Sequence, residues 1–141
     1  PIEESTTYCE TARRFGVDTI FLAAPSTSNE RLSKIVESTS GFLYLVSHFG
    51  VTGAREALEE STVQLIKRIL PYTAGRVPLA VGFGVSKSEH VQRIIQSGAD
   101  GVIVGSAFVN IIHKYTVDIS KAVKALEKFA RELKDATKQS H

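Results

Sequence analysis

Two short apolar runs, joined by a helical pattern, constrain the fold of this chain more than any other feature. The runs are Leu79–Val81 and Val102–Val104, and both lie within the stretch Leu79–Phe108. Three apolar residues between them recur at helical spacing among polar ones: Val91, Ile94 and Ile95. An apolar run, an amphipathic helix and a second apolar run are typical of a βαβ unit, whose two strands are parallel.

Glycine stands where each of these predicted strands ends. Gly82 and Gly84 follow the first strand, and Gly105 follows the second, directly before Ser106. Backbone without a Cβ atom lets amide N–H groups approach a ligand closely, and Ser106 opens a segment that predicts a short helix with free N–H groups at its start. One glycine pair is equally typical of an ordinary turn. Two glycine-ended parallel strands together predict a phosphate site, as after the last two strands of a (β/α)8 barrel.

The rest of the chain shows the same alternation. Apolar runs predict buried parallel strands at Thr19–Ala24 and Phe42–Ser47. Apolar residues at helical spacing predict helices at Pro1–Phe15, Glu30–Ser38, Glu56–Leu70, Ser106–His113 and Val117–Lys134, with Pro71 beyond the third of these. The first helix carries a stripe of Tyr8, Ala12 and Phe15.

A leading helix and four strand–helix units predict an α/β fold of parallel strands with outer helices. Because a complete (β/α)8 TIM barrel takes roughly 250 residues, we expect residues 1–141 to form one partial barrel domain with about half of the strands. The chain has no methionine and starts within a helical pattern, so we expect it to be a piece of a longer protein. Right-handed crossovers would place all four strand ends on one rim.

Acid–base groups are scarce on that predicted rim. Glu56 is the one carboxylate that could approach the rim, and we interpret it as a solvated residue in the first turn of a helix. His48 directly follows a strand and is the candidate histidine, against a loop or packing role. Tyr44 shares its strand face with Phe42 and Val46, which leaves open whether it faces the barrel interior or the helix layer. No pair of side chains has metal-ligand spacing, so the residues predict binding without evident catalysis.

Bulk properties exclude several classes of protein. A net charge of +2, with the basic residues spread over helix faces, argues against nucleic-acid binding. No apolar stretch approaches the roughly 20 residues that span a membrane, so we expect no membrane partner and a cytoplasmic location. The single cysteine, Cys9, falls in a helical pattern and is interpreted as a buried small side chain.

Five segments together resemble the C-terminal half of the tryptophan synthase alpha subunit family, over essentially the whole chain. They are PIEES at Pro1–Ser5, IFLAAP at Ile20–Pro25, Phe42–Ser47 followed by GVTGA at Gly50–Ala54, VGFGVS at Val81–Ser86, and GADGVIVGSA at Gly98–Ala107. The resemblance implies a lyase of tryptophan biosynthesis that cleaves indole-3-glycerol phosphate to indole and glyceraldehyde 3-phosphate. It also implies that the protein needs no cofactor of its own, because pyridoxal phosphate belongs to the partner beta subunit that receives the indole in a heterotetramer.

The resemblance also assigns residues. Four positions match the family's phosphate-binding positions: Gly53, Gly84, Gly105 and Ser106. Tyr44 and Phe83 match positions that line the indole and glycerol part of the pocket, and Thr52 matches the closing-loop threonine that hydrogen-bonds the catalytic aspartate. The family's catalytic glutamate and aspartate lie near the ends of early strands that this chain does not contain, so we expect this segment alone to be inactive.

Two other functions stay open at this point. A non-catalytic half-barrel module could pair with a second copy through its open sheet edges at Thr19–Ala24 and Val102–Val104. A different phosphate-binding barrel enzyme of amino-acid biosynthesis, such as a sugar-phosphate isomerase of the histidine pathway, would share the glycine-ended strands.

Overall fold

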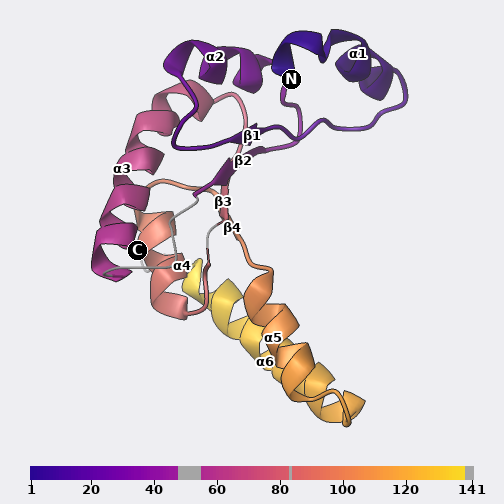
Figure 1. Cartoon of the computed structure of the whole chain (residues 1–141), viewed down its shortest axis with the longest axis vertical. Coiled ribbons are helices and arrows are strands. Elements are labelled where there is room, and N and C mark those ends of the chain that lie inside the picture. Colours follow the sequence, from indigo (N-terminus) through magenta and orange to yellow (C-terminus); the bar gives the residue numbers. More distant parts are fainter. Residues whose placement is uncertain (48–54, 83, 139–141) are drawn as a thin grey trace.

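Four parallel strands form one sheet at the centre of the protein. A computed structural model of the chain describes residues 1–47, 55–82 and 84–138. The strands lie in sequence order and are β1 (Leu22–Ala23), β2 (Leu43–Val46), β3 (Leu79–Gly82) and β4 (Gly101–Ile103) (Figure 1). Each strand pairs in parallel with the next, and Gly82 of β3 lies opposite both Val46 of β2 and Ile103 of β4. The predicted order and direction of the strands are confirmed.

The helices that connect these strands lie on one face of the sheet. They are α2 (Asn29–Ser38), α3 (Arg55–Thr73) and α4 (Ser88–Gln96) (Figure 1). At the chain start, a 3-10 turn η1 (Ile2–Glu4) precedes α1 (Thr6–Arg14). After β4, α5 (Ser106–Lys114) and α6 (Ile119–Ala136) form a two-helix arm that extends away from the sheet. This is the α/β alternation expected of half a (β/α)8 barrel.

Local signals in the sequence explain where several helices begin. Ser28 precedes α2, and its side chain accepts a hydrogen bond from the Arg31 amide at 3.3 Å. Asp118 does the same for α6 through the Lys121 amide at 3.1 Å. Both residues satisfy an N–H group that has no partner within its helix, which fixes the helix start.

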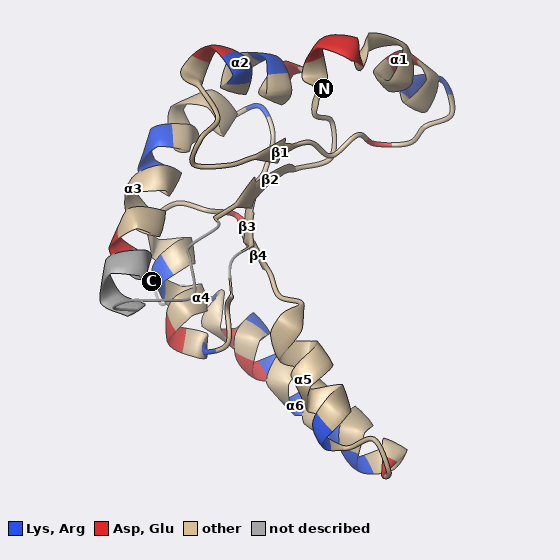
Figure 2. Ribbon diagram, in the orientation of Figure 1, with Lys and Arg blue, Asp and Glu red and all other residues tan. Residues whose placement is uncertain are grey.

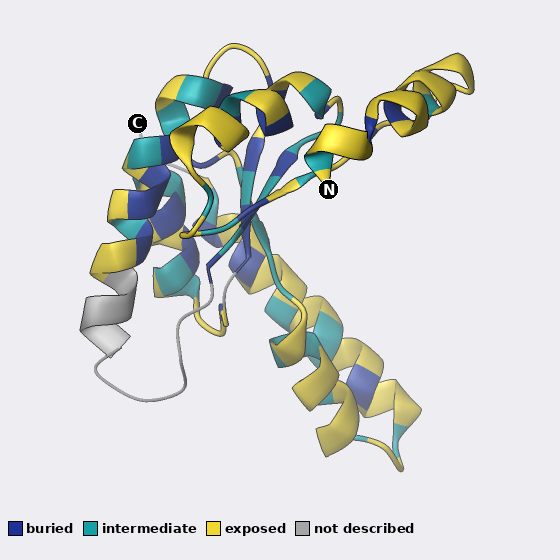
Figure 3. Cartoon of the chain, turned by 45° about the horizontal axis from the view of Figure 1, so that its top comes forward, coloured by how far each residue is buried: buried dark blue, intermediate teal, exposed yellow. Residues whose placement is uncertain are grey.

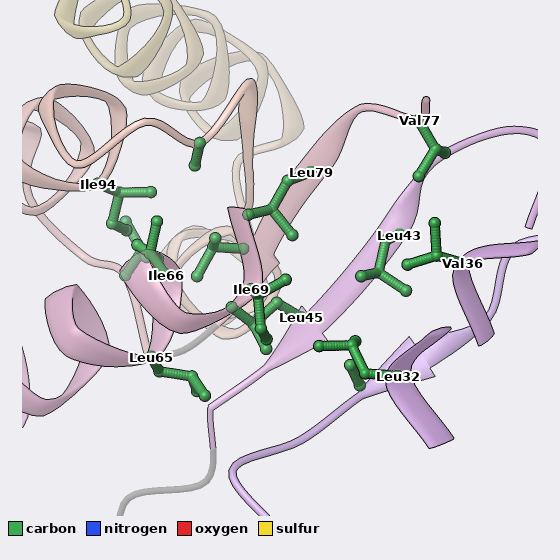
Figure 4. Close-up of a cluster of buried hydrophobic side chains, with 14 of the residues drawn as sticks. Leu32, Val36, Leu43, Leu45, Leu65, Ile66, Ile69, Val77, Leu79 and Ile94 are labelled. Carbon is green, nitrogen blue, oxygen red and sulfur yellow. The ribbon is translucent and has the colours of Figure 1, made fainter. Parts of the chain in front are cut away.

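The hydrophobic core fills the space between the helices and the covered face of the sheet (Figure 4). Leu43, Leu45 and Leu79 point into it from the strands and are fully buried, as is Ile66 of α3. The predicted core face of α2 is confirmed, because Leu32, Ile35 and Val36 are all buried. In α4, Val91 and Ile94 are buried as predicted, while Ile95, the third residue of the predicted face, is only partly buried. The buried side chains recur at helical spacing, so each helix can bury them on one side.

The other face of the sheet carries no helix in the described part of the chain. Burial alternates along β2, where Leu43 and Leu45 are buried while Tyr44 and Val46 are only partly so. Leu22 of β1 is 59% exposed, and Figure 3 shows partly buried residues among the buried ones along the strands. In a closed barrel this face would line the interior, so the two possible orientations of Tyr44 reduce to the interior one.

Several predicted boundaries were wrong, for physical reasons. The strand expected at Thr19–Ala24 shrinks to two residues, and Thr19 instead forms hydrogen bonds with Ser38, at the end of α2, and with Ser40 in the turn after it. The strands expected at Phe42–Ser47 and Val102–Val104 become β2 and β4, which are shorter or shifted by one residue. The helix expected to end before Pro71 continues to Thr73, because a proline in the last turn removes only one donor.

Several apolar side chains near the two ends of the chain are more exposed than the sequence predicted. The helix at Pro1–Phe15 divides at Ser5, and Tyr8 and Phe15 are 63% and 73% exposed. Cys9 is buried as expected, with its thiol facing the Ser38 carbonyl oxygen at 3.8 Å. In the arm, Ile119 also stays exposed although it belongs to the apolar stripe of α6. No described element covers these side chains, so periodicity alone did not bury them.

Charged side chains lie on the helices and loops, and the strands carry none (Figure 2). One ion pair joins α3 to α4, where Arg93 contacts Glu60 at 3.0 Å. A hydrogen bond from Gln64 at 2.9 Å and the charge of Arg93 lower the pKa of the Glu60 carboxyl. None of the helices in the described ranges combines the length and apolar character needed to cross a bilayer.

Candidate functional site

Parallel pairing brings the carboxyl ends of β2, β3 and β4 to the same end of the sheet. Gly82 pairs with Ile103, so the residues two positions further along, Gly84 and Gly105, lie at the same level beyond the strand ends. A ligand that reaches this end can therefore contact backbone from both strands, as the carboxyl ends of parallel strands do in barrel enzymes generally.

A pocket of about 260 Å³ opens at this end. Four residues predicted for the site lie in its wall, namely Tyr44, Gly84, Gly105 and Ser106. Gly82, which the sequence also placed at the strand end, completes it with four residues that the sequence did not single out as ligand contacts: Val46, Ser47, Val85 and Ile103. The sequence predicted that the two glycine-ended strands would end at the same site, and in the structure Gly84 and Gly105 line the same pocket.

The N-terminus of α5 contributes to the wall of this pocket. Ser106 is its first residue, and Gly105 occupies the cap position. The Gly105 carbonyl accepts hydrogen bonds from the amides of Phe108 at 3.0 Å and Val109 at 3.1 Å. In the first turn of a helix, the N–H groups before these have no carbonyl within the helix to reach. Those of Ser106 and Ala107 are thus available to an anion, which the helix dipole also favours.

Gly84 and Gly105 leave open space where a side chain would stand. A Cβ atom built at either position would have no described atom within 4 Å. Neither glycine is among those with positive φ, so backbone conformation does not require glycine there. The packing of the described residues therefore does not require glycine at these two positions. The lack of a side chain leaves the backbone there accessible.

Gly82 has a different role from the one its sequence position suggested. A Cβ atom there would lie 2.7 Å from the Tyr44 hydroxyl oxygen and 3.0 Å from Cζ. The Tyr44 ring therefore crosses from β2 over β3, and Gly82 makes room for it. Gly82, the last residue of β3, therefore serves side-chain packing, whereas Gly84 leaves open space at the pocket.

Three predicted site residues, Gly53, Thr52 and Phe83, lie outside the described residues, as does His48. The side chain of Glu56 is likewise outside them. No carboxylate lines the pocket in the described part of the chain. Across residues 1–47, 55–82 and 84–138, His, Cys, Asp and Glu form no group of three or more that could hold a metal ion. The described residues that line the pocket therefore present backbone amide groups, hydroxyl groups and apolar surface.

Two larger hollows lie elsewhere. One, of about 380 Å³, lies between β4 and the arm, against Phe108 and Leu133. The other, of about 480 Å³, lies at the amino ends of the strands, near Gly75 and Pro78. Neither combines glycine-ended strands with a helix N-terminus, so the smaller pocket is the better candidate for an anion.

Comparison with known proteins gives a consistent result. A family model described as "Tryptophan synthase alpha chain" matches residues 1–138. The tryptophan synthase alpha chain of Methanopyrus kandleri is 45% identical over 141 residues, which cover 100% of this chain and 50% of that relative. That of Methanocaldococcus jannaschii is 50% identical over 129 residues, which cover 92% of this chain and 44% of the relative.

Solved structures agree with the sequence relatives. A chain of the tryptophan synthase α2β2 complex from Pyrococcus furiosus superposes with a TM-score of 0.82 at 43% identity. The match covers 96% of this chain and 52% of that one. The chain thus spans about half the length of the relatives it matches.

Proposed function

The chain belongs to the tryptophan synthase alpha chain family, and from this premise we propose that it is the half of the barrel that binds the phosphate of indole-3-glycerol phosphate. The intact protein would cleave this substrate to indole and glyceraldehyde 3-phosphate, as a lyase of tryptophan biosynthesis. The family match also favours this reaction over that of another phosphate-binding barrel enzyme, such as a sugar-phosphate isomerase.

One observation carries the proposal. Gly84, Gly105 and Ser106, the first residue of α5, line one pocket, and no described atom lies within 4 Å of the place that a Cβ atom would take at either glycine. Amide N–H groups at a helix N-terminus are suited to a phosphate dianion, because they add several hydrogen bonds to the favourable helix dipole. The Ser106 hydroxyl, which also lines the pocket, is a further donor.

The remaining roles follow from family membership. Tyr44 would line the indole and glycerol part of the pocket with Phe83, while Gly53 would add a phosphate contact and Thr52 would orient the catalytic aspartate. That aspartate and the catalytic glutamate would come from the other half of the barrel, so we propose that this segment alone turns over no substrate. Fixing the phosphate would hold the indole end of the substrate in place for those carboxylates.

We further propose that the intact protein uses no cofactor of its own and works in the cytoplasm with a beta subunit. The structural neighbour from Pyrococcus furiosus comes from an α2β2 complex, which supports a beta subunit as the partner. In this arrangement, indole would pass to that subunit, where pyridoxal phosphate supplies the chemistry of the next step.

Titration of the chain with inorganic phosphate tests the site directly. Gly105→Val places a branched side chain in open space at the pocket, so binding should weaken about tenfold or more, the loss expected for one hydrogen bond to a charged group. The matched pair Gly105→Ala and Gly101→Ala serves as a control. A Cβ atom at Gly101 would meet only the Ala80 Cβ, at 3.9 Å, and Gly101 does not line this pocket.

Isothermal titration calorimetry measures the affinity, and thermal denaturation shows whether each variant folds. Gly101→Ala should bind phosphate as the parent chain does, whereas Gly105→Ala should bind it more weakly. Unchanged affinity in a folded Gly105→Val variant would show that the phosphate site lies elsewhere.

A second candidate function is assembly with another copy of this chain. Ile20 and Leu22 at the β1 edge are 45% and 59% exposed, and β4 presents the other open edge. Two copies related by a twofold axis could place each β4 beside the partner's β1 and close eight parallel strands. Sedimentation should then give a dimer that Leu22→Lys dissociates and Val117→Lys, in the turn of the arm, does not. A monomeric parent chain would contradict this proposal.

A further inference from the structure

Ser47 carries a buried hydroxyl group without a hydrogen-bond partner. The residue directly follows β2 and is 5% exposed. Its amide donates to the Gly82 carbonyl oxygen at 3.2 Å, so its backbone is tied to the sheet. Its Oγ is enclosed and, among the described residues, is the one buried side-chain nitrogen or oxygen atom without a partner.

This is unusual for a buried serine or threonine, because an unsatisfied polar group costs folding free energy. The other buried hydroxyl groups in the described ranges are satisfied. The hydroxyl groups of Ser5, Thr19 and Thr39 each donate to a backbone carbonyl at 2.7 Å. An orphaned polar atom in a native structure calls for a reason, and a missing ligand is a common one.

The place of Ser47 supplies that reason. It lines the same pocket as Gly84, Gly105 and Ser106, but it comes from β2, on the opposite side from the α5 N-terminus. A serine hydroxyl can be redirected by rotation about a single side-chain torsion, so it can turn toward an acceptor that fills the pocket. A phosphate oxygen is a strong acceptor, and a hydrogen bond to it is assisted by charge.

We propose that Ser47 is a phosphate-binding residue whose hydroxyl donates a hydrogen bond to an oxygen of the phosphate monoester held at the α5 N-terminus. This inference rests on the proposed function of the pocket and adds a contact from β2. The phosphate would then be bound at three neighbouring strand ends. The Ser47 hydroxyl would add one donor after β2 to the amide donors after β3 and β4.

The proposal predicts effects of opposite sign on stability and on binding. Without ligand, the unpaired hydroxyl lowers stability, so its removal in Ser47→Ala should leave the melting temperature unchanged or raise it. With ligand, the same change removes a donor, so the dissociation constant for inorganic phosphate should rise about tenfold, the lower end for a hydrogen bond to a charged group. If the hydroxyl had a purely structural role, Ser47→Ala would instead lower the melting temperature and leave the dissociation constant unchanged.

Ser5→Ala is a matched control, because Ser5 is 8% exposed, its hydroxyl is satisfied by the Ile2 carbonyl, and it does not line the pocket. This variant should lower the melting temperature and leave phosphate affinity unchanged. Ser47→Cys keeps the shape of the side chain with a weaker donor, so it should also bind phosphate more weakly while remaining folded.

The test is phosphate titration by calorimetry, together with thermal denaturation, of the whole 141-residue chain, these three variants and Gly105→Val. Parent-level affinity in Ser47→Ala, when the parent binds phosphate and Gly105→Val does not, overturns the role of Ser47 alone. A lower melting temperature in Ser47→Ala also overturns it, whatever the affinity, because the hydroxyl would then stabilise the chain without ligand and would not be unpaired. A parent chain that binds no phosphate removes the proposed function and this inference together.

Discussion

The contact between Gly82 and Tyr44 makes a quantitative prediction about the pocket wall. Gly82→Ala would place a Cβ atom 2.7 Å from the Tyr44 hydroxyl oxygen and 3.0 Å from Cζ, closer than such atoms normally approach. The next atom, the Ile103 Cβ, would be 3.4 Å away and close to ordinary contact. The tyrosine ring must therefore move, because it is partly exposed and the strand backbone is not free to shift.

The magnitude follows from two opposing effects. Overpacking of this kind costs about 1–3 kcal/mol, and displacement of a single ring should keep the cost near the lower end. In a Tyr44→Ala background the overlap disappears, and replacement of glycine by alanine should stabilise by about 0.5 kcal/mol through the unfolded chain. Because the effect on the unfolded chain is the same in both backgrounds, it cancels, and the two changes should be coupled by about 1 kcal/mol, above the usual error of about 0.5 kcal/mol in additivity.

Urea denaturation of the parent chain, both single variants and the double variant measures this coupling. Tyr44→Phe provides an internal scale, since it removes the 2.7 Å contact and keeps the 3.0 Å one. The coupling of Tyr44→Phe to Gly82→Ala should therefore be smaller than the coupling of Tyr44→Ala to Gly82→Ala. Additive effects in all backgrounds would refute the placement of the ring over β3, and with it the orientation of Tyr44 toward the pocket.

Three further predictions concern the frame around the site. Ile66→Ala should lower the free energy of unfolding by about 2–5 kcal/mol in urea denaturation, because Ile66 is fully buried in the core. Asp100→Ala should cost about 1–3 kcal/mol and speed amide exchange at Leu79, because the Asp100 carboxylate accepts that amide at 2.8 Å. The lowered pKa of Glu60 means that its stabilising contribution is present above the pKa of the unfolded chain, about 4.3, and is lost as the pH falls through the folded value. The stability gap between the parent and Glu60→Gln should therefore narrow in acid, and a gap that stays constant to pH 2 would contradict this assignment.

Sequence patterns predicted the parts of the fold that depend on local chemistry. The core faces of α2 and α4 follow from apolar residues at helical spacing, and the parallel strands follow from continuous apolar runs. Element boundaries were less accurate, because they depend on partners far away in the sequence. Thr19 left its predicted strand to bind Ser38 and Ser40, and Tyr8 and Phe15 stayed exposed for want of a covering layer.

The sequence by itself determined that two glycine-ended strands and a helix start would lie at one end of a parallel sheet, because that follows from residue types and chain order. Only the tertiary structure decided which glycine does what. Gly82 makes room for Tyr44 and Gly84 leaves open space, a difference that depends on a side chain from the neighbouring strand. It also decided that the Ser47 hydroxyl is buried without a partner. Burial and hydrogen bonding depend on which atoms pack around a group, and those atoms come from segments distant in sequence.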